Sequence, residues 1–342
     1  MARPTIKDLA QAANVSIATV NRVLGDSGSV RSATKQQVLE AARQIGFYAV
    51  GALEQRVAAS RPRHQLGVII QTPHRPFSEL LEQCLETAVR ETDECEVSLQ
   101  LEHLDDLSPE QVATRMEALA QSCDALAVLA AEHPLVSDAI DRIALLGVPV
   151  VTLVTPLSAR TQVGYVGLDS WKVGRTAAWA FAHLCKLPGK VGILVGTHRY
   201  RCHDMRESGF RSYFREHPGD FTMLEPLATF ESDAIARELT EKLLRDHPDL
   251  RGLYVSGGGI TGALAAIRAS GQSGKLVTVG HDLMGTTKAG LLDRSLTMVI
   301  SHPFEAIARE TVAATIRAKK AWPNGGSQSV LVPFDICTSE NI

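Results

Sequence analysis

The stretch TIKDLAQAANVSIATVNRVLGDSGSVRSATKQQVLEAARQIGF (residues 5–47) decides how the N-terminal part of the chain folds. Thr5 followed three residues later by Asp8 has the spacing of a capping box, and apolar residues then recur at helical intervals. Asn14 tolerates the left-handed backbone with which a helix ends, and Ser16 is a good N-cap for the next helix. The pattern predicts two short helices joined by a tight turn.

A third helix is predicted from near Ser32 to Gly46. The expected inner residues are Ile6, Leu9, Ala10 and Ala13 of the first helix, Val20, Val23 and Leu24 of the second, and Val38, Leu39, Ala42 and Ile45 of the third. Helix, tight turn, helix and a supporting helix make a helix-turn-helix, which places its second helix in the major groove of DNA. The alternative is an ordinary three-helix domain with a solvated basic face.

Charge is distributed unevenly along the chain. The first 63 residues carry nine Lys or Arg and four Asp or Glu, a formal charge of +5, whereas the whole chain is at −3 and the remainder therefore at −8. A basic head on an acidic body is expected where one end of a protein meets phosphate and the rest must not. Charge therefore favours the DNA-binding interpretation.

The segment VSIATVNRVL (residues 15–24) resembles the recognition helix of the LacI family of bacterial transcription regulators. That pattern is usually written V-S-x-x-T-V-S-R-V-L, and Asn21 stands where serine is commoner. The resemblance continues at lower density over nearly all 342 residues. It implies that residues 1–46 form a head that binds a pseudopalindromic DNA operator as part of a homodimer.

The resemblance implies that the second helix of the head reads DNA. Arg22 can make a bidentate contact to guanine, whereas Ile17 and Ala18 can only touch thymine methyl groups or exclude wrong bases. Ser16, Thr19 and Arg31 are expected to contact phosphate. The predicted DNA-binding residues of the head are Thr5, Ser16, Ile17, Ala18, Thr19, Asn21, Arg22 and Arg31.

Residues 47–64, FYAVGALEQRVAASRPRH, form a bridge in which ALEQRVAA has helical composition and Pro62 blocks continuation. The resemblance implies a hinge helix and linker here, with an apolar side chain inserted into the minor groove. The family's wedge leucine falls on Arg56 in this sequence. Either Leu53 or Val57 is then the wedge, or Arg56 reads a narrow groove electrostatically.

From Leu66 onward, apolar strands alternate with amphipathic helices at intervals typical of parallel, doubly wound sheets. Two successive series predict an α/β core of two lobes, like that of periplasmic sugar-binding proteins, with an effector cleft between them. The last helix, near 304–319, is expected to return to the first lobe. The expected limits are about 65–163 and 296–322 for the first lobe and about 164–295 and 323–342 for the second.

Composition favours a cytoplasmic protein of two or three domains. No run of 18 apolar residues predicts a transmembrane helix, and MARPTIKDLA (residues 1–10) lacks the pattern of a signal peptide. Six cysteines without C-x-x-C spacing indicate free thiols, and Cys202 beside His203 is too small a set to predict a metal site. We expect no cofactor, no metal and no membrane partner.

Four polar residues follow the strands that are expected to border the cleft. The family's R-x-x-G-F arginine corresponds to Arg206, and its acidic residue after the last strand of the second lobe corresponds to Asp282. Asp169 lies where the chain crosses between lobes, and His302 falls where related sugar-binding proteins carry glutamine. A guanidinium fork suits vicinal hydroxyls or a carboxylate. All four are predicted to bind the effector, and a helix cap or ion pair is the alternative for each.

Aromatic residues make up only 5% of the chain, so those near strand ends are candidates to stack on a sugar. Phe77 follows the first strand of the core, and Trp171 follows the crossing between the lobes. Both are predicted to line the cleft, with simple core packing as the alternative. Glu132 and His133, after the strand ALAVLAA, are further candidates.

The glycine-rich segment SGGGITG (residues 256–262) lies between a predicted strand and a predicted helix. It is either a tight turn or a loop whose backbone N–H groups hold a ligand at the helix N-terminus. It lacks the Lys-Ser/Thr of a P-loop, and neither G-x-S-x-G nor H-E-x-x-H occurs in the chain. The segment predicts no catalytic site.

The sequence therefore favours a dimeric, allosterically controlled DNA-binding repressor, with a sugar or related polyhydroxyl compound as effector. A purine or an amino-acid derivative is the alternative effector. An enzyme or a solute-binding protein sharing the α/β core would need a nucleophile and base, metal ligands or a signal peptide, and the sequence offers none. No heptads follow residue 320, so a dimer is expected rather than a tetramer.

Overall fold

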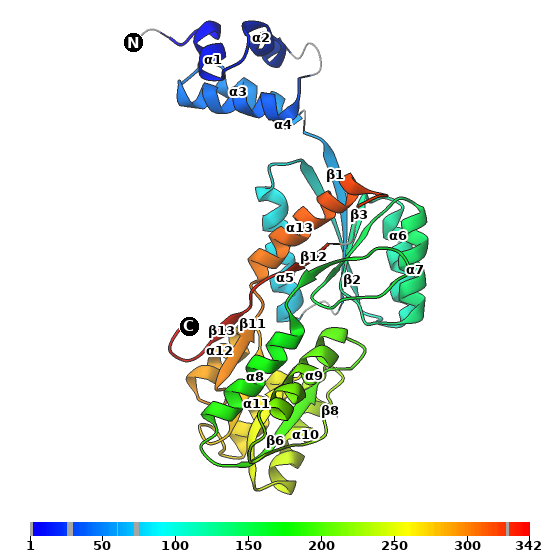
Figure 1. Cartoon of the computed structure of the whole chain (residues 1–342), viewed down its shortest axis with the longest axis vertical. Coiled ribbons are helices and arrows are strands. Elements are labelled where there is room, and N and C mark those ends of the chain that lie inside the picture. The colour runs from blue at the N-terminus through cyan, green and yellow to red at the C-terminus, as the bar shows by residue number, and fades with distance from the viewer. Residues whose placement is uncertain (1–2, 26–29, 60, 72–74, 326–327) are drawn as a thin grey trace. The chain divides into compact units, whose positions relative to one another are not determined.

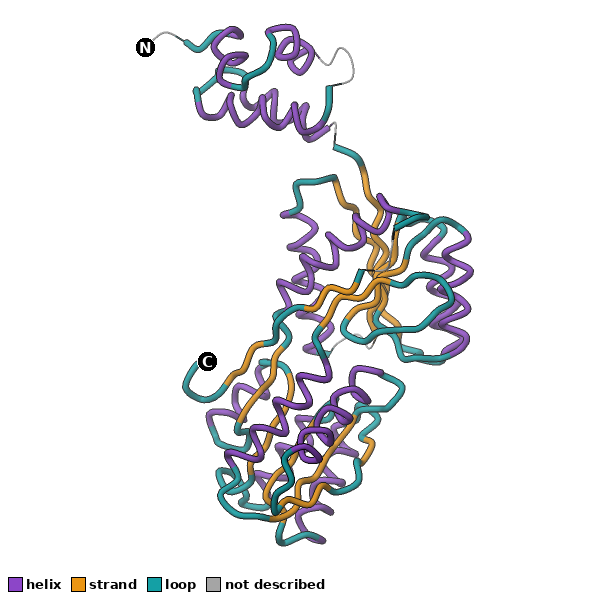
Figure 2. Tube along the Cα trace, in the orientation of Figure 1, coloured by secondary structure: helices purple, strands orange, loops and turns teal. Residues whose placement is uncertain are grey.

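The computed structural model describes residues 3–25, 30–59, 61–71, 75–325 and 328–342. The chain packs as two compact units, drawn as ribbon and tube in Figures 1 and 2. The first unit is the head, which comprises the residues up to 64 together with 92–98, and the second is the core, which comprises residues 65–91 and 99–342.

Four helices build the head: α1 (Ile6–Ala12), α2 (Ile17–Gly25), α3 (Ser32–Gln44) and α4 (Val50–Ala59). The predicted capping box between Thr5 and Asp8 is present at the start of α1. Asn14 has a φ of 48°, the left-handed conformation expected between α1 and α2. The Ser16 hydroxyl accepts the backbone N–H of Thr19 at 3.1 Å, which caps α2. The predicted helix-turn-helix is confirmed.

Helix α4 adds its apolar face to the core of the head. Leu53 and Val57 are 0% and 4% exposed and pack in the same hydrophobic cluster as the first three helices. Arg43 of α3 pairs with Glu54 of α4 at 2.8 Å. The expectation that Leu53 or Val57 wedges the minor groove is therefore wrong for this structure, because a side chain buried in the head cannot enter a base step. Of the three candidates, Arg56 is exposed.

The core contains two sheets, one in each lobe. The first-lobe sheet has six strands in the order β12-β5-β4-β3-β1-β2, and β1, β3, β4, β5 and β12 run parallel. Helices α5 and α13 pack together, as do α6 and α7, and the two pairs cover opposite faces of the sheet (Figure 1). The elements are β1 (Arg63–Gln71), α5 (Pro76–Glu91), β2 (Glu96–Leu104), α6 (Pro109–Ala120), β3 (Ala125–Val128), α7 (Pro134–Leu145), β4 (Val150–Leu153), β5 (Gly164–Gly167), α13 (Phe304–Ala321) and β12 (Ser329–Leu331).

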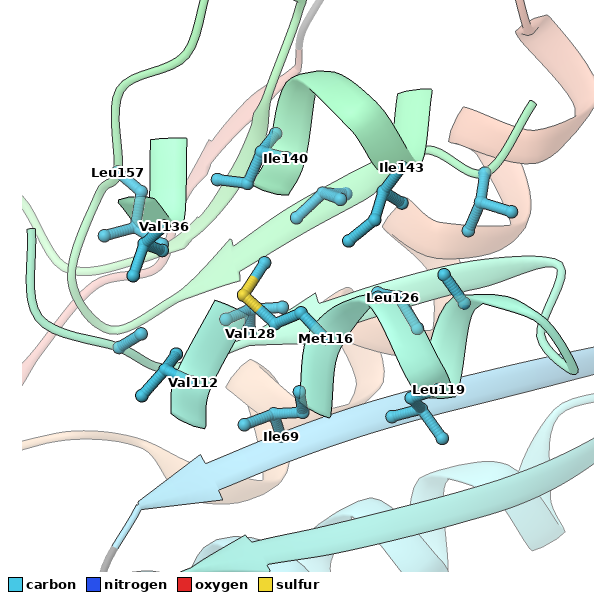
Figure 3. Packing of buried hydrophobic residues seen from close by; sticks show 14 of the residues in the cluster. Ile69, Val112, Met116, Leu119, Leu126, Val128, Val136, Ile140, Ile143 and Leu157 are labelled. Carbon is cyan, nitrogen blue, oxygen red and sulfur yellow. The ribbon is translucent and has the colours of Figure 1, made fainter. Parts of the chain in front are cut away.

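Strands β3 and β4 are buried along their whole length, as expected of central strands in a doubly wound sheet. Figure 3 shows Met116 of α6 beside Leu126 and Val128 of β3, with Ile140 and Ile143 of α7 above them in the same cluster. Such packing holds the parallel strands in their order. The loops that follow their carboxyl ends therefore emerge together at one edge of the sheet.

The second-lobe sheet follows the order β13-β11-β10-β9-β6-β7, with β8 also paired to β6. Helices α8 and α9 can pack closely because Gly174 and Gly209 have no side chain at their contact. A Cβ atom at either position would overlap the backbone of the facing helix. The elements are α8 (Ser170–Leu184), β6 (Gly189–Val195), α9 (Arg201–Glu216), β7 (Phe221–Met223), β8 (Leu227–Ala228), α10 (Asp233–Asp246), β9 (Leu250–Val255), α11 (Ile260–Ala269), β10 (Val277–His281), α12 (Gly285–Leu292), β11 (Met298–Ser301) and β13 (Asp335–Cys337).

The expected limits between the lobes need correction by one strand at each crossing. Residues 164–167 and 329–331 form β5 and β12 and pair within the first-lobe sheet, whereas residues 298–301 form β11 and pair within the second. The chain crosses after a strand has completed its ladder, so each lobe keeps the strand that precedes the crossing. The predicted return of the last helix is confirmed, since α13 packs on α5.

Within the described residues, no helix combines the length and the apolar character that crossing a bilayer requires. All six cysteines are free thiols, as the sequence predicts.

Candidate functional sites

One face of α2 presents the side chains that the sequence predicts to contact bases. Ile17, Ala18, Asn21 and Arg22 are exposed, and Ile17 is 47% exposed although it is a large apolar residue. The opposite face of α2 is buried in the core of the head. An apolar side chain held out in water on a recognition helix suits contact with thymine methyl groups.

The predicted phosphate contacts lie around this face. The hydroxyls of Ser16 and Thr19 are 2.9 Å apart, with Ser16 exposed. Arg31 is exposed at the N-cap of the 13-residue helix α3, where backbone N–H groups favour an anion. Thr5 is exposed too, but its hydroxyl donates to Asp8 at 2.7 Å, so the capping box already engages it.

A cavity of about 690 Å³ lies between the two lobes of the core. Its two walls differ in chemistry. The first-lobe wall includes the apolar side chains Phe77, Leu107, Leu129 and Val154. The second-lobe wall carries most of the ionisable groups, namely His203, Arg206, Glu231, Asp233, His281, Asp282 and His302.

Three of the predicted effector residues form a buried chain of hydrogen bonds on the second-lobe wall. The Nη2 group of Arg206 lies 3.2 Å from Nε2 of His302, and Nδ1 of His302 lies 2.6 Å from Oδ1 of Asp282. The same Oδ1 accepts the backbone N–H of His302 at 3.0 Å. Arg206 also donates from Nη1 to the carbonyl of Ser256 at 3.1 Å and is 3% exposed. This chain ties helix α9 to the ends of β9, β10 and β11.

His302 lines the cavity and is also held by contacts within the protein, and its predicted contact with an effector stays a prediction. In a neutral ring with the proton on Nδ1, His302 donates to Asp282 and accepts from Arg206, so both ring nitrogens are engaged within the protein. His302 therefore orients its two neighbours, as an amide in the same place would. Both bonds to Asp282 use Oδ1, which leaves Oδ2 for a ligand, and Nε of Arg206 is a buried donor with no partner among the described residues.

Burial shifts the protonation of several groups on this wall. Burial alone would raise the pKa of Asp282, but its contacts with His302 and Arg206 outweigh that effect and hold the pKa below its usual value. Burial lowers the pKa of His203 to about 4, although Glu231 acts in the opposite direction. Burial, assisted by the charge of Arg206, lowers the pKa of His281 well below 6.5. At neutral pH, His203 and His281 are therefore uncharged.

Phe77 lines the cleft from the first residues of α5. Its ring meets His302 edge-on, with centroids 5.7 Å apart, and Phe304 with centroids 5.2 Å apart. The structure therefore brings Phe77 to the chain of Arg206, His302 and Asp282, as the sequence predicts. Whether the ring also contacts an effector stays a prediction.

The other predicted effector residues lie away from the cavity lining. Asp169 caps helix α8 by accepting the backbone N–H of Lys172 at 3.1 Å and pairs with the Lys172 ammonium at 3.3 Å. Trp171, in the first turn of α8, is 40% exposed. Neither residue is among those that line the cavity, and Asp169 has the capping role that the sequence offered as its alternative.

Glu132 and His133 are also engaged elsewhere. The Glu132 carboxylate accepts the backbone N–H of Ser158 at 3.1 Å and lies 3.8 Å from Arg201 of the second lobe. His133 is the N-cap of α7, where its Nδ1 accepts the backbone N–H of Leu135 at 3.3 Å. Neither residue lines the cavity.

Glu231 is a cleft residue that sequence reasoning missed. It follows β8 in the sequence LATFES, with no motif around it. In the structure it lines the cavity together with Gly257 and Gly258 of the glycine-rich loop. The signal available in the sequence was the loop itself, because three successive glycines predict that something approaches the backbone closely.

The cleft also gathers residues with left-handed backbone. Val154, Phe230, Glu231 and Asp282 have φ values between 51° and 63°, and all four line the cavity. Such conformations are uncommon for non-glycine residues, above all for a β-branched valine, and they concentrate at functional sites. Among the described residues, no group of three or more His, Cys, Asp or Glu is placed to hold a metal ion.

Comparison with known proteins defines the class first. Residues 66–321, well over half of the chain, match the family described as "Periplasmic binding protein domain", and the chain belongs to that family. Residues 5–49 match the family described as "Bacterial regulatory proteins, lacI family". With both matches on one chain, the protein is a LacI-family regulator whose core has the periplasmic-binding-protein fold.

Individual relatives resemble this chain through the periplasmic-binding-protein fold. The Ribose import binding protein RbsB of Bacillus subtilis is 23% identical over 260 residues, which cover 74% of this chain and 80% of that protein. A glucose-galactose binding protein, GanP, from Geobacillus stearothermophilus has a TM-score of 0.74 at 16% identity and covers 82% of this chain and 99% of its own. A periplasmic solute binding protein from Actinobacillus succinogenes, with bound D-allose, has a TM-score of 0.74 at 18% identity, with 81% and 98% covered. At these identities the likeness to solved structures shows the fold.

Proposed function

We propose that this protein is a transcriptional repressor that binds a pseudopalindromic operator as a homodimer and whose affinity for DNA depends on a small molecule in its cleft. The head reads bases through Ile17, Ala18 and Arg22. The core binds the effector through Arg206 and Asp282, with Phe77 covering one face of it.

One observation carries the proposal. A buried set of hydrogen-bonded residues, Arg206, His302 and Asp282, borders the cavity and keeps a donor that no described residue pairs, and the same protein exposes the face of α2 that is suited to reading bases. The Nε group of Arg206 is buried without a partner among the described residues, and burying a donor in this way is costly. A ligand hydroxyl satisfies such a donor, and the second oxygen of Asp282 accepts another. The arrangement suits a polyhydroxyl compound.

The proposed coupling uses contacts that span the cleft. Arg75 of the first lobe donates to the backbone carbonyl of Glu231 in the second lobe at 2.7 Å, and Arg201 of the second lobe donates to Ser158 at 2.6 Å. An effector with different affinities for the open and closed lobes shifts the balance between them, and DNA affinity follows by linkage.

The names of relatives support a sugar as the effector, since they describe proteins for ribose, for glucose and galactose, and one with bound D-allose. A second candidate class is a purine, because Phe77, Leu107, Leu129 and Val154 give the first-lobe wall an apolar surface that suits a planar ring. A thermal-shift panel of sugars, polyols and nucleobases separates the two classes, since the effector raises the melting temperature by mass action.

The test of the cleft is the double substitution Arg206→Ala/Asp282→Ala. We expect this variant to bind operator DNA and to ignore the effector that the panel identifies, because both residues belong to the core and the DNA-contacting residues to the head. An unchanged response at the same effector concentration would show that the cleft assignment is wrong. Loss of operator binding as well would show that the two residues are structural.

The exposed side chain of Arg56 in α4 gives the hinge its own test. If Arg56 replaces the family's apolar wedge, Arg56→Leu tightens binding to an operator with a central C-G step and bends it more. Gel mobility of permuted operator fragments measures the bend. If wild type and Arg56→Leu bind the operator with equal affinity and bend it equally, Arg56 faces solvent and does not contact the minor groove.

A further inference from the structure

The carboxylate of Glu231 lies directly against the backbone of two glycine-bearing loops. A Cβ atom on Gly196 would overlap its Oε1, and a Cβ atom on Gly258 would overlap its Oε2. The absent side chains therefore make the space that this carboxylate fills. This accounts for the glycine at position 258. The sequence had allowed two interpretations of its loop, a tight turn or a loop that holds a ligand.

Several contacts fix Glu231 in this place. Phe230 and Glu231 have consecutive left-handed φ values of 51° and 60°, and the backbone N–H of Phe230 donates to the carbonyl of Gly196 at 2.8 Å. From the first lobe, Nη2 of Arg75 donates to the Glu231 carbonyl at 2.7 Å, and Nη1 lies 3.5 Å from Oε2. Two strained residues and a contact from the other lobe hold one carboxylate against the loop.

The same loop leads into α11, a ten-residue helix that begins at Ile260 with Gly259 as its N-cap. Glycine-rich loops before a helix N-terminus favour anions, because backbone N–H groups point at the ligand. Here the carboxylate of Glu231 places a negative charge of the protein itself beside that loop. Oε1 of Glu231 is buried and has no hydrogen-bond partner among the described residues, so the backbone of the loop does not neutralise it.

The described charges around the cavity do not favour an anionic ligand either. The lining includes Arg75 and Arg206 as cations and Glu231, Asp233 and Asp282 as carboxylates. Both arginines are engaged by the protein, Arg75 by Glu231 and Arg206 by Ser256 and His302. An anion entering the cleft meets excess negative charge.

We propose that Glu231 is the charge-selecting residue of the cleft: its carboxylate excludes phosphorylated and other anionic compounds and admits neutral or amine-bearing ones. The inference rests on the proposed role of the cleft in binding an effector and narrows the class of that effector. A second negative charge about 5 Å from a carboxylate, at an effective dielectric constant of about 20, corresponds to a loss of roughly a hundredfold in affinity.

The test uses inorganic phosphate as the probe and three variants of the full-length protein. Glu231→Gln removes the charge and keeps the shape. Glu231→Gly removes both, and glycine accepts a φ of 60° without strain. Glu238→Gln is the matched control, because Glu238 lies exposed on α10 and its substitution changes the net charge equally. Thermal shift and calorimetry are recorded in phosphate and in chloride at constant ionic strength, with near-UV circular dichroism to establish that each variant is folded.

We expect wild type and Glu238→Gln to show no difference between phosphate and chloride. Both Glu231 variants should bind phosphate saturably, with Glu231→Gly at least about tenfold tighter than wild type, since Nη1 of Arg75 and the loop are then free of the carboxylate and can meet the anion. Adding Arg75→Ala to Glu231→Gly should remove the gain, which places the phosphate in this pocket.

Two results would overturn the inference: wild type that binds phosphate as tightly as Glu231→Gly, or folded Glu231 variants that remain indifferent to it. Failure of the proposed effector function gives a different result. In that case the wild-type protein responds to no neutral compound in the ligand panel. The difference in phosphate binding between wild type and the Glu231 variants is still measurable and tests the inference separately.

Discussion

The head and the core place their functional side chains in opposite surroundings. In the head, Ile17, Ala18 and Arg22 are exposed on α2, and the Nε group of Arg22 donates to the carbonyl of Ala18, one turn away, at 3.3 Å. In the core, Arg206 and Asp282 are buried and joined through His302. Residues of the first kind act one at a time, whereas residues of the second kind act as a unit.

The largest expected effect of this difference is on stability. Asp282→Ala or Arg206→Ala alone should lower the free energy of unfolding by about 3–5 kcal/mol, because each leaves a buried charge without its compensating group. The double variant should cost less than the sum, with a coupling of about 0.5–3 kcal/mol. Urea unfolding followed by tryptophan fluorescence measures this in the core, since Trp171, Trp179 and Trp322 all lie there.

The matched substitutions in the head are Arg22→Ala and Arg31→Ala. Both side chains are exposed, so each should change stability by less than about 0.5 kcal/mol. If the changes in unfolding free energy for Arg206→Ala and Asp282→Ala simply add in the double variant, the two residues do not act as a unit, and the core does not differ from the head in this respect.

The second prediction concerns acid. The pKa of His203 falls from its ordinary 6.5 to about 4 in the folded core because of burial. Below pH 6.5 the unfolded chain takes up a proton that the folded core resists until about pH 4. Stability is therefore complete above pH 6.5 and falls as pH drops from 6.5 to 4, by on the order of 3 kcal/mol for this residue. The first histidine of the chain is His64, so residues 1–63 contribute nothing of this kind.

The measurement is urea unfolding of the core at a series of pH values. His203→Gln should flatten part of the decline between pH 6.5 and 4, and buried His281 should account for part of the remainder. His198→Gln serves as the control, because that side chain is about half exposed. A decline of the same steepness in His203→Gln and wild type would contradict the assignment.

How much could be foreseen also differs between the two regions. The head was predictable because its signals are local: a capping box, a left-handed Asn14 and a helical stripe each lie within a few residues. Arg206 and Asp282 were foreseen from their correspondence to motifs of the family, and Phe77 from its place after the first strand of the core. Glu231 was not, because its partners Gly196 and Gly258 lie 35 and 27 residues away and no local pattern joins them.

The errors have the same origin. Asp169 and Trp171 follow a strand that the sequence assigned to the second lobe, whereas β5 pairs within the first. Leu53 was a candidate wedge because it is an apolar residue near Arg56, where the family's wedge leucine falls, but the packing of α4 on the head decides whether its side chain is buried or exposed. Long-range pairing and packing decide such cases, and a local pattern does not record them.

The third prediction tests whether the head reads sequence through single side chains. Arg22→Ala should cost about 1–3 kcal/mol at the cognate operator and flatten the preference at one base pair. Fluorescence anisotropy with operators that vary at each position measures both effects. An equal loss of affinity on every sequence would make Arg22 a phosphate contact instead.

The smallest effect belongs to Arg31, which is exposed at the N-cap of α3. A charge that meets one phosphate releases about one counterion, so Arg31→Ala should weaken binding uniformly across sequences and reduce the slope of log affinity against log salt by about one unit. Anisotropy titrations between low and moderate salt give the slope, with Arg245→Ala, exposed on α10 of the core, as the control for net charge. If Arg31→Ala changes the preference among operators but leaves the salt slope intact, Arg31 reads bases, and the division of roles within the head has to be redrawn.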